Sequence, residues 1–210
     1  RRRLGAAEAR RMTFATMLFA LAIATTIASS RAASDDAFLR AYAVTHDERD
    51  IHIPACGDVD AFEGEFAFAD VEISAHVPFP DVDRRGRYTG RTRFAIRHVT
   101  LHFPAAVIWP GITERERAAV KTALAALRHH EIGHVRVAAA EVARLNAGPL
   151  TVTPDAEVYR RTEVRRQDAG LAAVARAQRA YDALTEHGRR QTRASGALRG
   201  PATELRCDTQ

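Results

Sequence analysis

Residues 130–134 form the sequence His-Glu-Ile-Gly-His, and in a helix this spacing has a specific chemical meaning. Residues four apart lie on the same helix face, so the imidazoles of His130 and His134 point toward one place. Two neutral imidazoles bind zinc well and leave room for a third ligand and a water. Glu131 lies on the flank of that face, where it can take a proton from the zinc-bound water. The pattern therefore predicts a zinc site with Glu131 as the catalytic base.

The flanking sequence predicts the helix that carries these three side chains. Thr113 followed by Glu116 forms a capping box, in which a hydroxyl and a carboxylate satisfy free backbone donors at a helix start. Apolar residues then recur at helical spacing as far as Leu145, and the sequence Asn-Ala-Gly-Pro at 146–149 ends the pattern. We expect one long helix with the zinc-binding pattern in its middle.

A second helix is predicted to follow. Residues 153–155, Thr-Pro-Asp, provide a cap, a proline at the first position and an early acid. The alanine-rich pattern continues to His187, with Gly170 as its weakest point and Gly188 as a C-terminal stop. We expect residues 189–210 to form a polar tail.

The strands are expected between residues 33 and 110. Alternating apolar and polar residues predict a strand over 66–77, with a change of register near Asp70 that indicates a bulge. A second strand is predicted over 91–103, and Pro104 follows it. Strands before helices indicate an α+β fold, with a small antiparallel or mixed sheet packed on long helices.

The N-terminal segment has the pattern of an export signal. Five arginines precede an apolar run over 12–27, and small residues follow as far as Ala32. This predicts a signal peptide over 1–32, followed by one catalytic domain over 33–210 that is exported to the periplasm or the medium. An uncleaved membrane anchor is the alternative, but the apolar run is shorter than the roughly 18 residues that a membrane span requires.

The net charge of +5 is a consequence of this segment. Residues 1–32 contain six arginines and one glutamate, so the remaining chain contains 25 basic and 25 acidic side chains. A formally neutral protein is not typical of nucleic-acid binding. We therefore expect no nucleic-acid partner, and no stable membrane insertion after the signal has been cleaved.

Cys56 and Cys207 are the two cysteines of the chain. In an exported protein, two distant cysteines predict one long-range disulfide, with two free thiols as the alternative. Their spacing does not resemble that of a metal-binding or redox motif.

Three segments resemble a family of predicted secreted zinc-dependent proteases, a bacterial domain otherwise of unknown function. They are Thr-Leu-His-Phe-Pro at 100–104, the zinc-binding pattern at 130–134, and Tyr-Asp-Ala-Leu-Thr-Glu-His-Gly at 181–188, which is soon followed by Gln191. The resemblance covers roughly residues 88–191. It implies a zincin-like fold in which the strand over 97–103 lies near the site and an extended substrate adds to it as a β-strand.

The resemblance also implies that His187 is the third zinc ligand, but helix geometry raises an objection. His134 lies about 18 Å before the end of its helix, and an antiparallel second helix would reach that level near residues 163–170. An unbroken helix would then carry His187 some 25–30 Å past the site. Either the second helix breaks near Gly170, or the third ligand is Glu163 or Asp168. A site with no third protein ligand is the remaining alternative.

Two residues shortly before His187 have candidate roles as well. Tyr181 could donate a hydrogen bond to the oxyanion of the tetrahedral intermediate, or it could be a core aromatic residue. Asp182 could hydrogen-bond a ligand imidazole from behind, or it could lie on a solvated helix surface.

These observations together predict an exported zinc metallopeptidase that acts on a peptide or protein. One alternative is an exported protein that binds zinc without catalysis, although such a site has no need of Glu131. The other is a zinc amidase that acts on cell-envelope material. The sequence shows no specificity pocket that would separate a peptide from another amide substrate.

Overall fold

The computed structural model describes residues 33–56 and 67–203. The chain forms two compact units, residues 1–38 and 39–210, and the sheets and both long helices belong to the second unit. The predicted signal peptide, residues 1–32, lies outside the described residues. The predicted α+β class is confirmed for the described chain.

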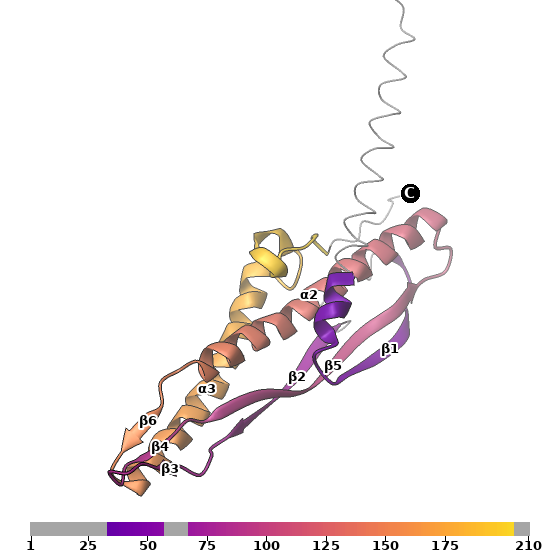
Figure 1. The fold of residues 1–210 in the computed structure, drawn as a ribbon. Coiled ribbons are helices and arrows are strands. Elements are labelled where there is room, and N and C mark those ends of the chain that lie inside the picture. The colour runs from indigo at the N-terminus through magenta and orange to yellow at the C-terminus, as the bar shows by residue number, and fades with distance from the viewer. Residues whose placement is uncertain (1–32, 57–66, 204–210) are drawn as a thin grey trace, which may run out of the picture. The chain divides into compact units, whose positions relative to one another are not determined.

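The larger sheet has three strands: β1 (Val44–His52), β2 (Phe68–His76) and β5 (Arg93–Ile108). Their order is β1-β5-β2, with β1 parallel and β2 antiparallel to the central strand (Figure 1). Since β5 has a hydrogen-bonded neighbour on each side over Val99–His102, a substrate strand cannot add to it there. The expectation that the substrate pairs with residues 97–103 is therefore wrong, and β2 is an edge strand of the described sheet.

Both predicted strands form, with two differences in detail. The pairing of β2 with β5 shifts register between Glu72 and Ile73, where the extra residue is Arg97 of β5, so the bulge predicted in this strand near Asp70 lies in its partner strand. β5 does not end before Pro104 but continues through it to Ile108. Proline has no N–H to donate, so it is tolerated where a strand lacks a neighbour on one side. The described part of β2 pairs with β5 only as far as His102, so at Pro104 the described neighbour of β5 is β1 alone.

The first long helix, α2 (Glu114–Asn146), has the predicted bounds. The capping box of Thr113 and Glu116 is present in both directions, with the Thr113 hydroxyl accepting from the Glu116 backbone and the Glu116 carboxylate accepting from the Thr113 backbone. α2 packs against β5. Ile132 and Val135 of the helix are fully buried, as are Val99 and Leu101 of the strand.

The second long helix, α3 (Ala156–Thr185), is capped by Asp155 two residues after the predicted cap at Thr153. The carboxylate of Asp155 accepts hydrogen bonds from two free backbone N–H groups of the first turn. The helix continues through Gly170 without the break that the sequence had suggested. A Cβ on Gly170 would lie 2.3 Å from the Phe94 ring, so this glycine permits α3 to approach the sheet closely.

The connection between the two helices explains why α3 needs no break. The chain leaves α2 at Asn146 and continues in an extended form through β6 (Thr151–Thr153). This strand pairs with β4 (Tyr88–Gly90), which in turn pairs with β3 (Asp81–Val82), in a second small antiparallel sheet. α3 therefore begins well beyond the end of α2 and runs back along it (Figure 1).

The segment after α3 folds back onto the helices and is not a polar tail as far as residue 203. Two short 3₁₀ helices, Gln191–Arg193 and Gly196–Leu198, follow α3. Gln191 is fully buried, and a Cβ on Gly200 would lie 2.3 Å from the His129 ring. Most residues of this segment are exposed, but Gln191, Ala194 and Gly200 are buried.

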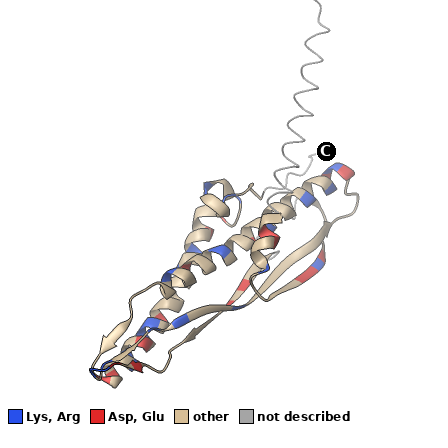
Figure 2. Cartoon of the chain, in the orientation of Figure 1, with Lys and Arg blue, Asp and Glu red and all other residues tan. Residues whose placement is uncertain are grey.

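Cys56 is disulfide-bonded, as predicted, and its predicted partner Cys207 lies outside the described residues. Cys56 packs beside a small apolar core of Ile53, Val107, Trp109 and Val120. Basic and acidic residues are interspersed along the described elements (Figure 2). Within the described residues, no helix is both long and apolar enough to cross a membrane.

Candidate metal centre

The centre begins with His130 and His134 on consecutive turns of α2, as the spacing predicted. Their ring centroids lie 4.9 Å apart and the ring planes are nearly perpendicular. His130 is 2% exposed. α2 continues on both sides of this pair and packs against β5, which holds the two histidines in place.

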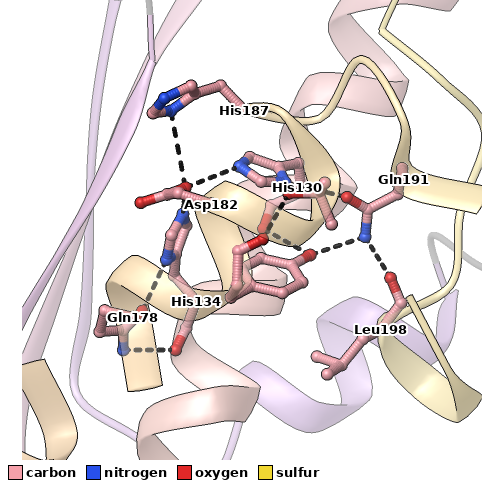
Figure 3. A network of polar contacts seen from close by, with 9 residues as sticks. His130, His134, Gln178, Asp182, His187, Gln191 and Leu198 are labelled. Carbon is pink, nitrogen blue, oxygen red and sulfur yellow. Dashed lines mark hydrogen bonds and ion pairs between the residues drawn. The ribbon is translucent and has the colours of Figure 1, made fainter. Parts of the chain in front are cut away.

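α3 contributes the third member of the centre, Asp182. Its Oδ1 atom lies 2.9 Å from Nε2 of His134 and 3.5 Å from Nε2 of His130. One ligand atom from each of the three residues lies within 4.8 Å of the others. The sequence had placed Asp182 behind a ligand imidazole, whereas its carboxylate faces both histidines directly (Figure 3).

The donor set and its spacing fit a zinc ion. Two nitrogen donors and one carboxylate oxygen are ordinary zinc ligands, and three protein ligands are the number found at catalytic sites. Two donors that each lie about 2.0–2.1 Å from a tetrahedral ion are about 3.3–3.4 Å apart. The two distances from Asp182 Oδ1, 2.9 and 3.5 Å, lie on either side of this value.

Two glutamines orient the histidines from behind. Nδ1 of His134 lies 2.6 Å from the Gln178 side-chain oxygen, and Nδ1 of His130 lies 2.9 Å from that of Gln191. The amide orientations follow from their other contacts, because the Gln178 NH2 group donates to the His134 carbonyl and that of Gln191 donates to the Leu198 carbonyl (Figure 3). Each imidazole must therefore donate from Nδ1 to an amide oxygen.

This arrangement leaves the Nε2 atoms of His130 and His134 as the nitrogens that could bind a metal ion. In the neutral tautomer that the glutamines select, Nε2 carries a lone pair. Two lone pairs facing the carboxylate of Asp182 repel it unless a cation, either a proton or a metal ion, lies between them. The polar contacts thus describe a site built around a positive charge.

Electrostatics at the centre agree with this conclusion. Burial lowers the pKa of His134, but the hydrogen bond to Asp182 and the charge of Glu131 outweigh burial and raise it above its usual value. Burial raises the pKa of Asp182, but the hydrogen bonds to His130 and His134 outweigh burial and hold it well below its usual range. The carboxylate of Asp182 is therefore ionised and available as a ligand throughout the physiological range.

Glu131 lies beside the centre and is 5% exposed. Burial raises the pKa of its carboxyl group, although the nearby His134 and His130 and a backbone hydrogen bond from Ala69 in β2 oppose the rise. A base with a raised pKa is better matched to proton transfer near neutral pH than an ordinary carboxylate. Glu131 lines the same cleft as His134 and Asp182.

Residues 62–188 match the family described as "Bacterial protein of unknown function (DUF922)". The chain belongs to the DUF922 family. The matched range contains the metal centre and β2, β5, α2 and α3. No curated protein and no solved structure matches the chain. The family description assigns no activity, so the chemistry has to be inferred from the centre itself.

At the end of the DUF922 match, His187 lies beside the centre but outside the group of three. Its Nδ1 atom is 3.7 Å from Oδ1 of Asp182, and its side chain is 76% exposed. Glu186, His187 and Gly188 all have positive φ angles, which turn the chain sharply after α3 and place Gly188 against His130. The turn brings the His187 ring to the centre without any break in α3.

Tyr181 also lies in the DUF922 range, and its contacts are those of a buried aromatic residue. Its ring stacks on His130 at 5.0 Å between centroids and is 4% exposed. Its hydroxyl donates to the His130 carbonyl at 3.4 Å and accepts from the Gln191 amide at 2.6 Å. A Cβ on Gly133 would lie 2.0 Å from this hydroxyl, which explains a glycine in the middle of α2.

Glu163 and Asp168, the alternative third ligands, do not join the centre. The carboxylate of Glu163 is fully buried and accepts hydrogen bonds from the backbone and hydroxyl of Thr92 and from the hydroxyl of Thr151. It lies about 28 Å along α3 from Asp182, because 19 residues separate them. Asp168 is exposed on the same helix. The helix-level estimate failed because it ignored the extended segment that includes β6.

Sequence reasoning missed Gln178 and gave Gln191 no role. A signal for Gln178 was present, because it lies four residues before Asp182 and so one turn away on the same face of α3. For Gln191, the sequence showed only that it follows the segment 181–188 closely. Its contact with His130 depends on the positive-φ turn after α3, which the sequence pattern alone does not specify.

Proposed function

We propose that this DUF922 protein is a zinc-dependent hydrolase, and specifically a peptidase, with His130, His134 and Asp182 as its zinc ligands. The observation that carries the proposal is the convergence of two histidine Nε2 atoms on one carboxylate, in a cleft that Glu131 also lines. A structural metal site would not need a second, buried carboxylate beside it.

Glu131 is the general base in this proposal. Its carboxylate takes a proton from the attacking water and then donates it to the leaving amine. Bound at these residues, zinc supplies Lewis acidity that polarises the scissile carbonyl and lowers the pKa of the attacking water. The buried position of Glu131, and the raised pKa that follows from it, keep the carboxyl group poised for both transfers.

The proposal revises the roles of two residues. Asp182, not His187, is the third ligand, because its carboxylate is the oxygen that both ligand imidazoles face. The exposed ring of His187 is left to hydrogen-bond Asp182 or to contact the substrate. Tyr181 positions His130 by stacking on its ring, and its hydroxyl has two buried partners in place of the oxyanion.

We also propose that the enzyme is exported and acts on a peptide or protein in the periplasm or the medium. The export pattern over 1–32 and the disulfide at Cys56 support this location, since disulfides persist in oxidising compartments. The equal numbers of basic and acidic side chains after residue 32 argue against a nucleic-acid substrate.

Glu131→Gln tests the catalytic part of the proposal. The amide cannot accept the water's proton at neutral pH, so hydrolysis should fall about 100- to 10,000-fold while folding and zinc content stay unchanged. Turnover of a denatured-protein substrate is compared by mass spectrometry, with Glu141→Gln as the control. Glu141 lies on the same helix and pairs with Arg144 away from the centre.

Three outcomes would change the conclusion. If Glu131→Gln turns over the substrate as fast as the wild type, Glu131 is not the base. If the zinc-loaded wild type cleaves no peptide, the non-catalytic zinc-binding protein becomes the better account. The hydrogen bond between Glu131 and the Ala69 backbone would then serve to tie α2 to β2. Cleavage of cell-envelope amides but not of peptides would favour the amidase.

A further inference from the structure

The cleft beside the metal centre has one polar end and one apolar end. Its volume is about 510 Å³, within the range of small-ligand sites. The polar end contains Glu131, His134, Gln178 and Asp182. The rest of the lining comes from apolar side chains of β2 and α3: Val71, Ile73, Leu171, Val174 and Ala175.

The apolar residues of β2 form one wall of the cleft and those of α3 form the other. Both rows of residues lead away from the polar end. Ala69 of β2 lies at the polar end, where its backbone contacts Glu131, and Val71 and Ile73 follow on the same side of the strand. The other end of β2 is fixed near Gly170, because Ala75 pairs with Phe94 and the Phe94 ring lies against that glycine. The apolar walls therefore lead away from the centre, toward the middle of α3.

The apolar part of this cleft is partly open to solvent. Leu171 is 37% exposed, and Phe68, which lies at the cleft beside Ala69, is 51% exposed. Exposed apolar side chains that continue directly from a polar reaction centre are typical of a substrate-binding surface. We propose that the apolar part of the cleft, between β2 and α3, binds an apolar side chain of an extended peptide substrate. The inference rests on the proposed peptidase function and adds a specificity to it.

The geometry also gives the position of that side chain. Val174 and Leu171 lie about 12 and 16 Å along α3 from Asp182, at 1.5 Å per residue. Val71 and Ile73 lie about 7 and 13 Å along β2 from Ala69, at about 3.3 Å per residue. An extended peptide covers these distances in about two to five residues. The apolar side chain should thus lie about two to five residues from the scissile bond, on one side of it.

The test compares the cleavage pattern of a peptide library between the wild type and two variants, each with an exposed apolar residue of α3 replaced by aspartate. The mature, zinc-loaded protein is incubated with tryptic peptides of a whole proteome, and new ends are identified by mass spectrometry. We expect apolar residues to be enriched about two to five positions from the bond on one side. Leu171→Asp should weaken this preference about tenfold or more.

The matched control is Val164→Asp. Val164 lies on α3 two turns before Leu171, is 42% exposed and does not line the cleft, so its substitution should leave the preference unchanged. Cleavage that depends on Glu131 but shows no apolar enrichment would overturn the inference and leave the peptidase function intact. An equal loss of preference in both aspartate variants would overturn it as well.

A binding measurement separates this inference from the proposed function if no peptide is cleaved. An alanine-based decapeptide with one central leucine, and its aspartate counterpart, are titrated into zinc-loaded Glu131→Gln by calorimetry. Tighter binding of the leucine peptide, lost in the double variant with Leu171→Asp, would support the apolar subsite even without catalysis. Equal affinity for the two peptides would contradict the inference.

Discussion

At the scale of single residues, the chemistry of the centre depends on which nitrogen of each histidine is free. Gln178 and Gln191 approach the two imidazoles from behind and accept from Nδ1, while their own NH2 groups are held by backbone carbonyls. Because a carbonyl cannot donate, neither amide can rotate without losing a hydrogen bond. The Nε2 atoms of both histidines are thereby fixed toward Asp182.

Gln178→Leu should therefore weaken zinc binding without unfolding the protein. Leucine has a similar size but leaves Nδ1 of His134 without a partner and frees the ring to rotate, so we expect zinc affinity to fall about 10- to 100-fold. Competition with a chromogenic chelator measures the affinity. Gln167→Leu, on the same helix and outside the metal centre, is the control. An unchanged affinity in Gln178→Leu would mean that this glutamine does not orient the ligand.

At the scale of elements, two glycines allow the long helices to pack closely. Gly133 of α2 lies against the Tyr181 hydroxyl, and Gly170 of α3 lies against the Phe94 ring. In an open helix position, glycine to alanine stabilises by about 1 kcal/mol. At these two positions the added methyl group has no room, so the sign of the effect should reverse.

Gly133→Ala and Gly170→Ala should each lower the free energy of unfolding by about 1–3 kcal/mol, as measured by urea denaturation. They should differ in metal binding. The first displaces Tyr181, which stacks on His130, so zinc affinity should fall as well. The second lies far from the centre and should leave zinc affinity unchanged. A stabilised Gly133→Ala would show that α2 and Tyr181 are not packed as described.

The elements also show how far the sequence could predict this structure. The bounds of α2, its capping box and the face shared by His130 and His134 follow from local spacing, and the structure confirms them. β1 was not predicted, because its parallel pairing with β5 depends on contacts about 55 residues apart in sequence. Which residues of α3 lie beside His130 and His134 depends on the extended connection between the helices, and no helical pattern encodes its length. The sequence therefore predicted Asp182 only as a hydrogen-bond partner behind a ligand imidazole.

At the scale of the whole molecule, we propose that the protein is exported to an oxidising compartment. The mature protein should begin shortly after Ser30 or Ala32, and N-terminal sequencing of protein from the periplasm or the medium checks this. The same material should contain no free thiol on titration without reductant, in keeping with the disulfide at Cys56. A chain that still begins at Arg1 would contradict the proposed export.

The metal content of the purified mature protein tests the central claim most directly. Inductively coupled plasma mass spectrometry after dialysis should find about one zinc per chain in the wild type and in His187→Ala. The variants His134→Ala and Asp182→Ala should have lost most of their zinc, while circular dichroism shows that they remain folded. A metal-free wild type, or stoichiometric zinc in His134→Ala, would contradict the account. Zinc that is retained in Asp182→Ala but lost in His187→Ala would move the third ligand to His187.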